Sequence, residues 1–112
     1  MVSRTELYKQ AIKLWGREFQ ALMLCEEMAE LQKAVCKALR VKLPSQPERR
    51  EKEILKLKDA ITEEIADVQL MIEQVEEMFE IPQSAVEAIK AYKLKRLADL
   101  IGCTFRESDN VA

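Results

Sequence analysis

Four acidic residues at helical spacing are the side chains of this chain best suited to chemistry. Glu27 and Glu30 stand three positions apart in one segment, and Glu64 and Asp67 repeat that spacing in another. Side chains three positions apart lie on the same face of a helix, so each pair presents two carboxylates side by side. Carboxylate clusters without histidine or thiolate ligands select hard cations such as Mg²⁺ or Mn²⁺. If the two pairs face each other, they are suited to holding Mg²⁺ with positions open for substrate phosphates.

The neighbours of these acids distinguish them from the other acidic pairs of the chain. Glu27 lies one helical turn from both Met23 and Leu31, and apolar residues flank Glu64 in the same way. Each acid therefore interrupts an apolar stripe, where an unpaired carboxylate is costly unless a proton, a base or a metal neutralises it. Periodicity alone leaves a second interpretation open, in which these acids simply form ion pairs with nearby lysines.

The composition of the 112-residue chain excludes several other kinds of active site. The chain has no histidine, which removes Ser-His-Asp and Cys-His catalysis and HExxH zinc sites. Its two glycines cannot build a phosphate-binding loop from backbone amides. Its three cysteines form no CxxC pair, which is typical of reduced thiols in a cytoplasmic protein. Any activity is then expected to depend on carboxylates, amines and a metal ion.

Charge and hydropathy narrow the choice of partners. Lys and Arg total 18 against 20 Asp and Glu, a formal charge of -2, so no basic excess favours a nucleic-acid partner. No apolar run approaches the roughly 18 residues of a membrane span, and the first residues do not open a signal peptide. We therefore expect neither nucleic acid nor a membrane as a partner.

The elements that must position the acids are predicted to be helices. Ala, Leu, Glu, Lys, Gln and Met abound, and strand-type alternation is absent. Capping boxes that begin at Ser3 and Ser45, Gly16, Pro82 and Gly102 mark the predicted helix ends. We expect a single all-α domain over residues 1–112, with a loose tail at 103–112 and helices at about 4–15, 17–41, 47–80 and 83–101.

The third predicted helix is too long for a small globule. At 1.5 Å per residue it would measure about 50 Å, whereas a compact chain of this length has a radius of gyration near 13 Å. Such a helix either frays at its charged start or packs against a second copy of the chain. We expect an obligate homodimer or a dimer of dimers.

The acidic segments and their flanks resemble one enzyme family, the MazG-like, all-α nucleoside triphosphate pyrophosphohydrolases. That family carries EExxE on one helix and ExxD on the next, and this chain has EEMAE at residues 26–30 and EIAD at residues 64–67. The flanks Trp15-Gly16, Gln20 and the run at residues 92–97 also look like the small single-domain members. The resemblance covers about residues 5 to 101. One departure is the gap of 33 residues between the two motifs, which looks long for the family.

The resemblance implies a four-helix bundle, assembled as a homodimer or homotetramer, that uses Mg²⁺ to hydrolyse a (deoxy)nucleoside triphosphate to the monophosphate and pyrophosphate. Residue by residue, it implies that the metal ligands are Glu27, Glu30, Glu64 and Asp67. The substrate is expected near a subunit interface. The long gap places loop contacts to the substrate in doubt, because the excess lies in the loop around Pro44 and the charged start of the third helix.

Other side chains are candidates for the remaining roles. Glu26 or Glu63, which are not predicted ligands, would orient the attacking water or take its proton. Lys37, Lys93 and Arg96 would bind the phosphates, since no glycine loop can do so. For each of them an ordinary role as helix-surface charge stays open.

Two alternative functions remain at this point. Phosphoribosyl-ATP pyrophosphohydrolases share the general architecture, and nothing in the sequence singles out or excludes their substrate. A helical interaction module with an inactive site is the alternative from another class, and the intact set of four acids argues against it.

Overall fold

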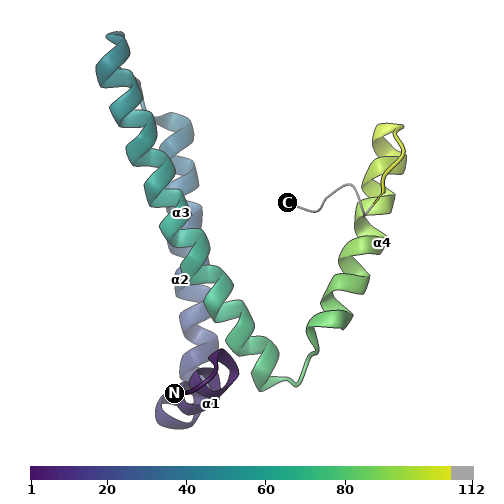
Figure 1. Ribbon diagram of the computed structural model, residues 1–112. Helices are drawn as coiled ribbons and strands as arrows, with labels where there is room; N and C mark the ends of the chain where they lie inside the picture. Colours follow the sequence, from purple (N-terminus) through teal and green to yellow (C-terminus); the bar gives the residue numbers. More distant parts are fainter. Residues whose placement is uncertain (107–112) are drawn as a thin grey trace. The chain divides into compact units, whose positions relative to one another are not determined.

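The structure is a computed structural model that describes residues 1–106. Over that range the chain is all-helical, without strands, which confirms the predicted fold class (Figure 1). The helices are α1 (Arg4–Trp15), α2 (Arg17–Arg40), α3 (Pro47–Met78) and α4 (Gln83–Ile101). None of these helices combines the length and the apolar character needed to cross a bilayer.

The chain divides into two compact units, which are described separately. The first unit, Met1–Phe79, contains α1, α2 and α3, and the second begins at Glu80 and contains α4. The predictions of a single domain and of a bundle of all four helices stay predictions. The predicted loose tail falls partly at residues 107–112, which lie outside the described residues, and residues 103–106 carry no regular secondary structure.

The helix ends show where local sequence signals acted and where they did not. The Ser3 hydroxyl accepts a hydrogen bond from the Glu6 amide at 3.1 Å, as the capping box predicts. The box predicted at Ser45 does not form, because α3 begins at Pro47 with Gln46 as its N-cap and without a side-chain hydrogen bond. Gly102 ends α4 in the left-handed region, at φ 86°, where glycine is favoured.

Two predicted helix ends lie too far along the chain. α2 ends at Arg40 because Val41 is extended, with φ -69° and ψ 140°. α3 ends at Met78, two residues before the predicted end, because Glu80 adopts a positive φ of 52°. The chain therefore leaves the helix before the Ile81-Pro82 step rather than at it.

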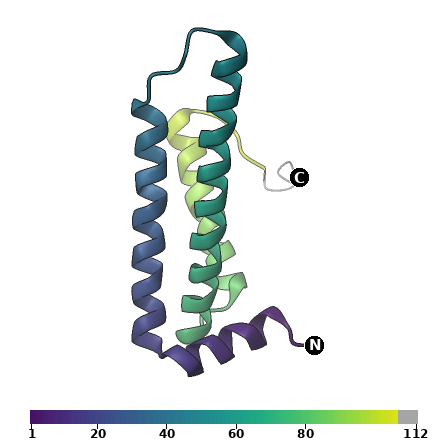
Figure 2. The same cartoon turned by 90° about the vertical axis from the view of Figure 1, so that its left-hand side faces the viewer.

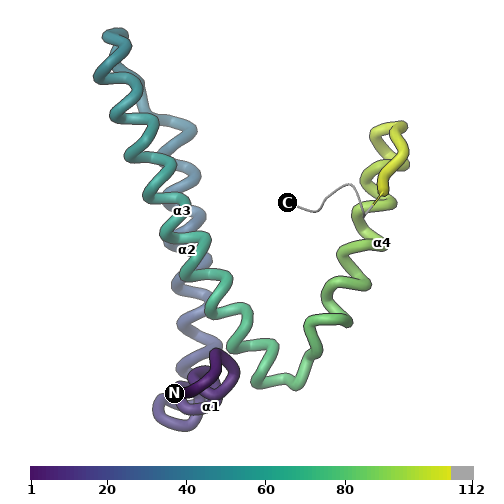
Figure 3. The backbone as a smooth tube through the Cα atoms, in the orientation of Figure 1, coloured from purple at the N-terminus to yellow at the C-terminus, as the bar shows by residue number. Residues whose placement is uncertain are grey.

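In the first unit, α2 and α3 form an antiparallel pair. In the tube view, α2 runs upward from purple to blue and α3 returns downward from teal to green (Figure 3). The turned view shows the two helices side by side over most of their length (Figure 2). α1 runs across the end of the pair that is opposite the loop at residues 41–46 (Figure 2). This pairing brings the segments around residues 27 and 64 to the same level.

The buried part of the first unit contains few apolar side chains and one polar pair. Val68, Met71 and Met78, all on α3, are its buried hydrophobic residues. Gln20 on α2 and Gln74 on α3 are buried as well, and the Gln20 side-chain amide donates to Gln74 Oε1 at 2.7 Å. This hydrogen bond joins α2 and α3 at one level of the pair.

Polar contacts attach α1 to α3. The Tyr8 hydroxyl donates to Glu73 Oε1 at 2.6 Å, and Arg4 lies 3.3 Å from the same oxygen. Lys9 lies 3.7 Å from Glu77 one turn further along α3. Partial burial, followed by the hydrogen bond to Glu73 and its charge, raises the pKa of Tyr8 to about 12. The tyrosine therefore stays protonated and keeps donating across the neutral range.

The buried glutamine pair is expected to contribute measurably to stability. Gln20→Leu leaves Gln74 Oε1 buried without its donor, which should lower the free energy of unfolding by about 1–3 kcal/mol. Urea unfolding at a fixed protein concentration measures the loss. The exposed Gln32→Leu serves as the control and should change little. The double variant with Gln74→Leu should recover part of the loss, and a Gln20→Leu protein as stable as the wild type would contradict the assignment.

Candidate metal centre

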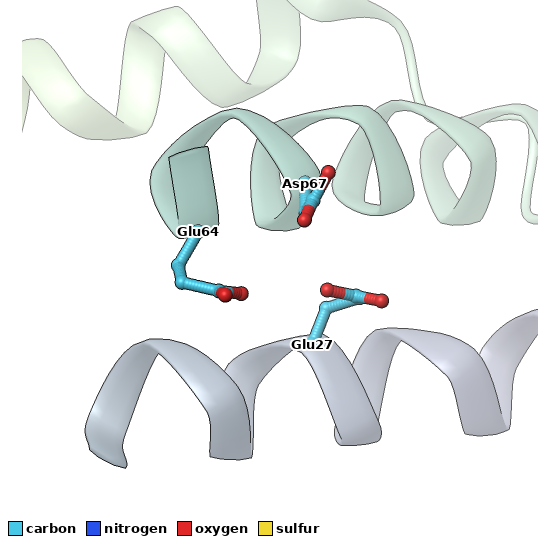
Figure 4. A group of neighbouring side chains, drawn as sticks. All are labelled: Glu27, Glu64 and Asp67. Carbon is cyan, nitrogen blue, oxygen red and sulfur yellow. The ribbon is translucent and has the colours of Figure 1, made fainter. Parts of the chain in front are cut away.

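Three of the predicted acidic residues converge between α2 and α3. One carboxylate oxygen each from Glu27, Glu64 and Asp67 lies within 4.8 Å of the other two. Glu27 projects from α2, while Glu64 and Asp67 project from α3, and all three point into the space between the helices (Figure 4). Each side chain is half-buried.

The helical register of α3 explains why its two acids face α2. Glu64, Asp67, Val68 and Met71 follow the spacing of one helix face, and Val68 and Met71 are buried. The acids therefore continue the face that packs inward, one or two turns before the buried residues. Glu27 meets them because α2 runs antiparallel alongside (Figure 2).

The electrostatics of the cluster are unfavourable without a counter-charge. Partial burial raises the pKa of Glu27 above its ordinary value, and the charge of Asp67 is the next largest cause, with Glu64, Glu30 and Glu26 adding to it. The pKa of Glu64 is raised for the same reasons, burial first and Asp67 second. Within residues 1–106, the ion pairs are Arg4–Glu73, Lys9–Glu77 and Lys90–Glu87, so none reaches this cluster.

The donor set fits a hard divalent cation. Carboxylate oxygens are the ligands that Mg²⁺ and Ca²⁺ prefer, at about 2.0–2.6 Å from the ion. Two oxygens on opposite sides of one ion are then about 4–5 Å apart, which is close to the 4.8 Å within which the three oxygens lie. A cation between them would also remove the like-charge repulsion that raises the pKa values of Glu27 and Glu64.

Glu30, the fourth predicted ligand, lies beside this cluster. It is exposed on α2, and its charge contributes to the raised pKa values of both Glu27 and Glu64. It also lines, together with Glu64, a cavity that extends away from the cluster between the two helices. Its carboxylate is not among the three that converge, so its role as a ligand stays a prediction.

The two candidates for handling the water proton lie at the edge of the cluster. Glu26 and Glu63 are exposed, and each immediately precedes a clustered acid along its helix, Glu27 and Glu64 respectively. The charge of Glu26 contributes to the raised pKa of Glu27, and that of Glu63 to the raised pKa of Glu64. Among the described hydrogen bonds, none orients the carboxylate of either residue. Their role in handling the water proton therefore stays a prediction.

The predicted phosphate-binding residues fall in different places. Lys37 lines the cavity that Glu30 and Glu64 share. Lys93 and Arg96 line a separate surface hollow on α4, with Leu97 and Leu100, in the second unit. Sequence reasoning missed Lys56, which lines the cavity from α3. The sequence signal that could have identified Lys56 is its spacing: Lys56, Ala60 and Glu64 are four positions apart and so form one row along the helix.

Comparisons of the chain with protein-family models, with curated proteins and with solved structures gave no match. The resemblance to MazG-like enzymes therefore depends on the two acidic motifs and their flanks. The site is interpreted below from its own geometry and charges.

The raised pKa of Glu64 predicts a pH-dependent effect on stability. A carboxyl whose pKa is higher in the folded state than the ordinary 4.5 keeps its proton to higher pH when folded, so stability falls as pH rises through the folded-state pKa. Glu64→Gln removes that loss. In the presence of a chelator, the variant should therefore have a higher Tm than the wild type at pH 7, and the difference should vanish below about pH 4.

The matched control for this experiment is Glu51→Gln, an exposed acid on α3 remote from the cluster. Its Tm should follow that of the wild type at both pH values. A Glu64→Gln protein that is less stable than the wild type at pH 7 without metal would show that the carboxylate is favourably compensated in the folded state.

Proposed function

We propose that this chain is a Mg²⁺-dependent pyrophosphohydrolase that converts a (deoxy)nucleoside triphosphate to the monophosphate and pyrophosphate. The observation that carries the proposal is the convergence of Glu27, Glu64 and Asp67 from two helices, without a compensating cation among the described residues. The same residues belong to the EExxE and ExxD motifs on which the resemblance to MazG-like enzymes rests. Mn²⁺ is an alternative ion, because it prefers the same oxygen ligands.

Glu27, Glu64 and Asp67 would hold the ion, with Glu30 beside them as the fourth predicted ligand. When bound, Mg²⁺ lowers the pKa of water and neutralises charge on phosphate oxygens. Because one oxygen of each of the three carboxylates already lies within 4.8 Å of the other two, little reorganisation would be needed to hold an ion between them.

The reaction requires a group that accepts a proton from the attacking water. The water oxygen forms a bond to the α-phosphorus, the bond from that phosphorus to the bridging oxygen breaks, and pyrophosphate leaves with the electron pair. A carboxylate oxygen of Glu26 or Glu63 takes the proton, since both lie next to the cluster and are exposed. Lys37 is positioned on the cavity that adjoins the cluster and would bind the phosphates leaving as pyrophosphate.

Self-association into a homodimer or homotetramer is part of the proposal. On α2, Phe19, Leu22 and Leu39 leave 51%, 61% and 83% of their surface exposed. The first unit buries only three apolar side chains of α3 as its described hydrophobic core, which is little for a unit of this size. A second copy of the chain, whose surface carries the same apolar side chains, is the partner that covers them.

The ligand set is tested by Glu64→Gln and Asp67→Asn. In the wild type, Mg²⁺ at 100 times its Kd should stabilise the fold by about 2.7 kcal/mol, seen as a rise in Tm, and both variants should lose most of that rise. Pyrophosphate release should fall by at least about 100-fold, because even changes behind a metal ligand cost 10- to 100-fold. Glu51→Gln should keep both properties. Unchanged turnover in Glu64→Gln would remove Glu64 from the site.

A substrate panel separates the alternative functions. All common and damaged NTPs and dNTPs, together with phosphoribosyl-ATP, are assayed with Mg²⁺ for release of pyrophosphate. Release from nucleoside triphosphates supports the proposal, whereas release from phosphoribosyl-ATP alone would assign the chain to the related activity. No release from any of them, with no coupled binding of Mg²⁺ and a non-hydrolysable dNTP, would favour an inactive interaction module.

The oligomer is tested by the mass in solution. Light scattering should give two or four times the chain mass of 13.0 kDa. Placing a charge on the exposed apolar face of α2, as Phe19→Glu or Leu22→Glu, should lower the mass toward one chain, while the exposed Gln32→Glu should leave it unchanged. A wild-type mass of 13.0 kDa at every concentration would contradict self-association.

A further inference from the structure

A cavity of about 340 Å³ lies between α2 and α3 beside the acidic cluster. Glu30 and Glu64 form its border with the cluster, and from there it extends toward the loop at residues 41–46, because α2 and α3 run antiparallel. Ala34 and Ala60 contribute only methyl groups to its lining, which leaves room between the helices. Its size falls within the range of small-molecule sites, about 300–1,000 Å³.

Three lysines line this cavity, Lys33 and Lys37 from α2 and Lys56 from α3. Within the described part of the chain, the ion pairs lie elsewhere, so none of these ammonium groups is within ion-pair distance of a carboxylate. Three ammonium groups from two facing helices thus border one space without a direct ion pair, although three carboxylates share the lining. This arrangement suits a ligand with several negative charges.

The charge of the cavity is expected to depend on whether a divalent cation is bound at the cluster. Glu30, Glu64 and Glu53 balance the three lysines in the metal-free chain. A cation held at the cluster neutralises Glu64 and offsets Glu30, and the cavity then becomes positive. Binding of an anion is therefore expected to be coupled to binding of the metal, and by linkage each should strengthen the other.

We propose that this cavity binds the β- and γ-phosphates of the substrate, and that Lys56 and Lys33 are binding residues alongside Lys37. This inference rests on the proposed function and adds the direction in which the substrate lies across the site. The phosphate tail runs from the carboxylates toward the loop at residues 41–46, and the nucleoside lies on the opposite side of the cluster.

The axial distances agree with this direction. Lys37 lies about 10 Å along α2 from Glu30, and Lys56 lies about 12 Å along α3 from Glu64, at 1.5 Å per residue. Lysine stems lie along apolar surface and carry the ammonium group to its partner, so the alanine and leucine lining of the cavity supports such a reach. Two lysines from opposite helices would then contact the end of the tail from both sides.

The test uses inorganic tripolyphosphate as the probe, in calorimetric titrations with excess Mg²⁺ and with a chelator. The wild type should bind it in Mg²⁺, and binding should weaken at least tenfold in the chelator. Lys56→Gln and Lys37→Gln should each weaken the Kd by about tenfold, because each removes a charge-assisted contact. Lys56→Arg should retain binding.

The matched control is Lys58→Gln, which removes an exposed lysine of α3 that does not line the cavity. Equal Kd values for Lys56→Gln and Lys58→Gln would overturn the inference. If the wild type hydrolyses a nucleoside triphosphate and Lys56→Gln leaves KM unchanged, the enzyme proposal stands and the cavity assignment fails. If tripolyphosphate binding depends on Lys56 but no triphosphate is hydrolysed, the anion site stands and the proposed activity fails.

Discussion

Like-charge repulsion among half-buried carboxylates is the constraint around which the first unit is organised. Glu27, Glu64 and Asp67 bring three acidic oxygens within 4.8 Å of one another. Partial burial is the largest single cause of the raised pKa of Glu27 and of Glu64, and the charge of Asp67 is the next. A fold that served only stability would not place these side chains there, because apolar residues would pack the same face at lower cost. The cation proposed above would relieve this repulsion.

The level at which α2 meets α3 decides whether these acids converge. Gln20 and Gln74 join the helices through one buried hydrogen bond, and Val68 and Met71 pack near it on the same face of α3. A shift of one turn would move Glu27 by about 5.4 Å relative to Glu64 and Asp67 and would disperse the cluster. The buried polar pair near one end of the helices and the acidic cluster further along are therefore parts of the same register.

Helix identity could be predicted from the sequence because it depends on local signals. Apolar spacing, the Ser3 cap and Gly102 acted within one or two turns, and all of them appear in the structure. The errors arose where several local signals competed. The Ser45 box lost to a start at Pro47, whose fixed φ suits the first turn of a helix, and Glu80 turned the chain at positive φ before Pro82 acted.

The sequence by itself determined which acids share a helix face, since a period of 3.6 residues is a property of each helix alone. It could not determine which face of α2 meets which face of α3, because that depends on long-range packing. Only the tertiary structure decided that Glu27 joins Glu64 and Asp67 while Glu30 lies beside them, and that Lys56 shares a cavity with Lys33 and Lys37. These residues are distant in the chain, and the antiparallel pairing of two helices brings them together.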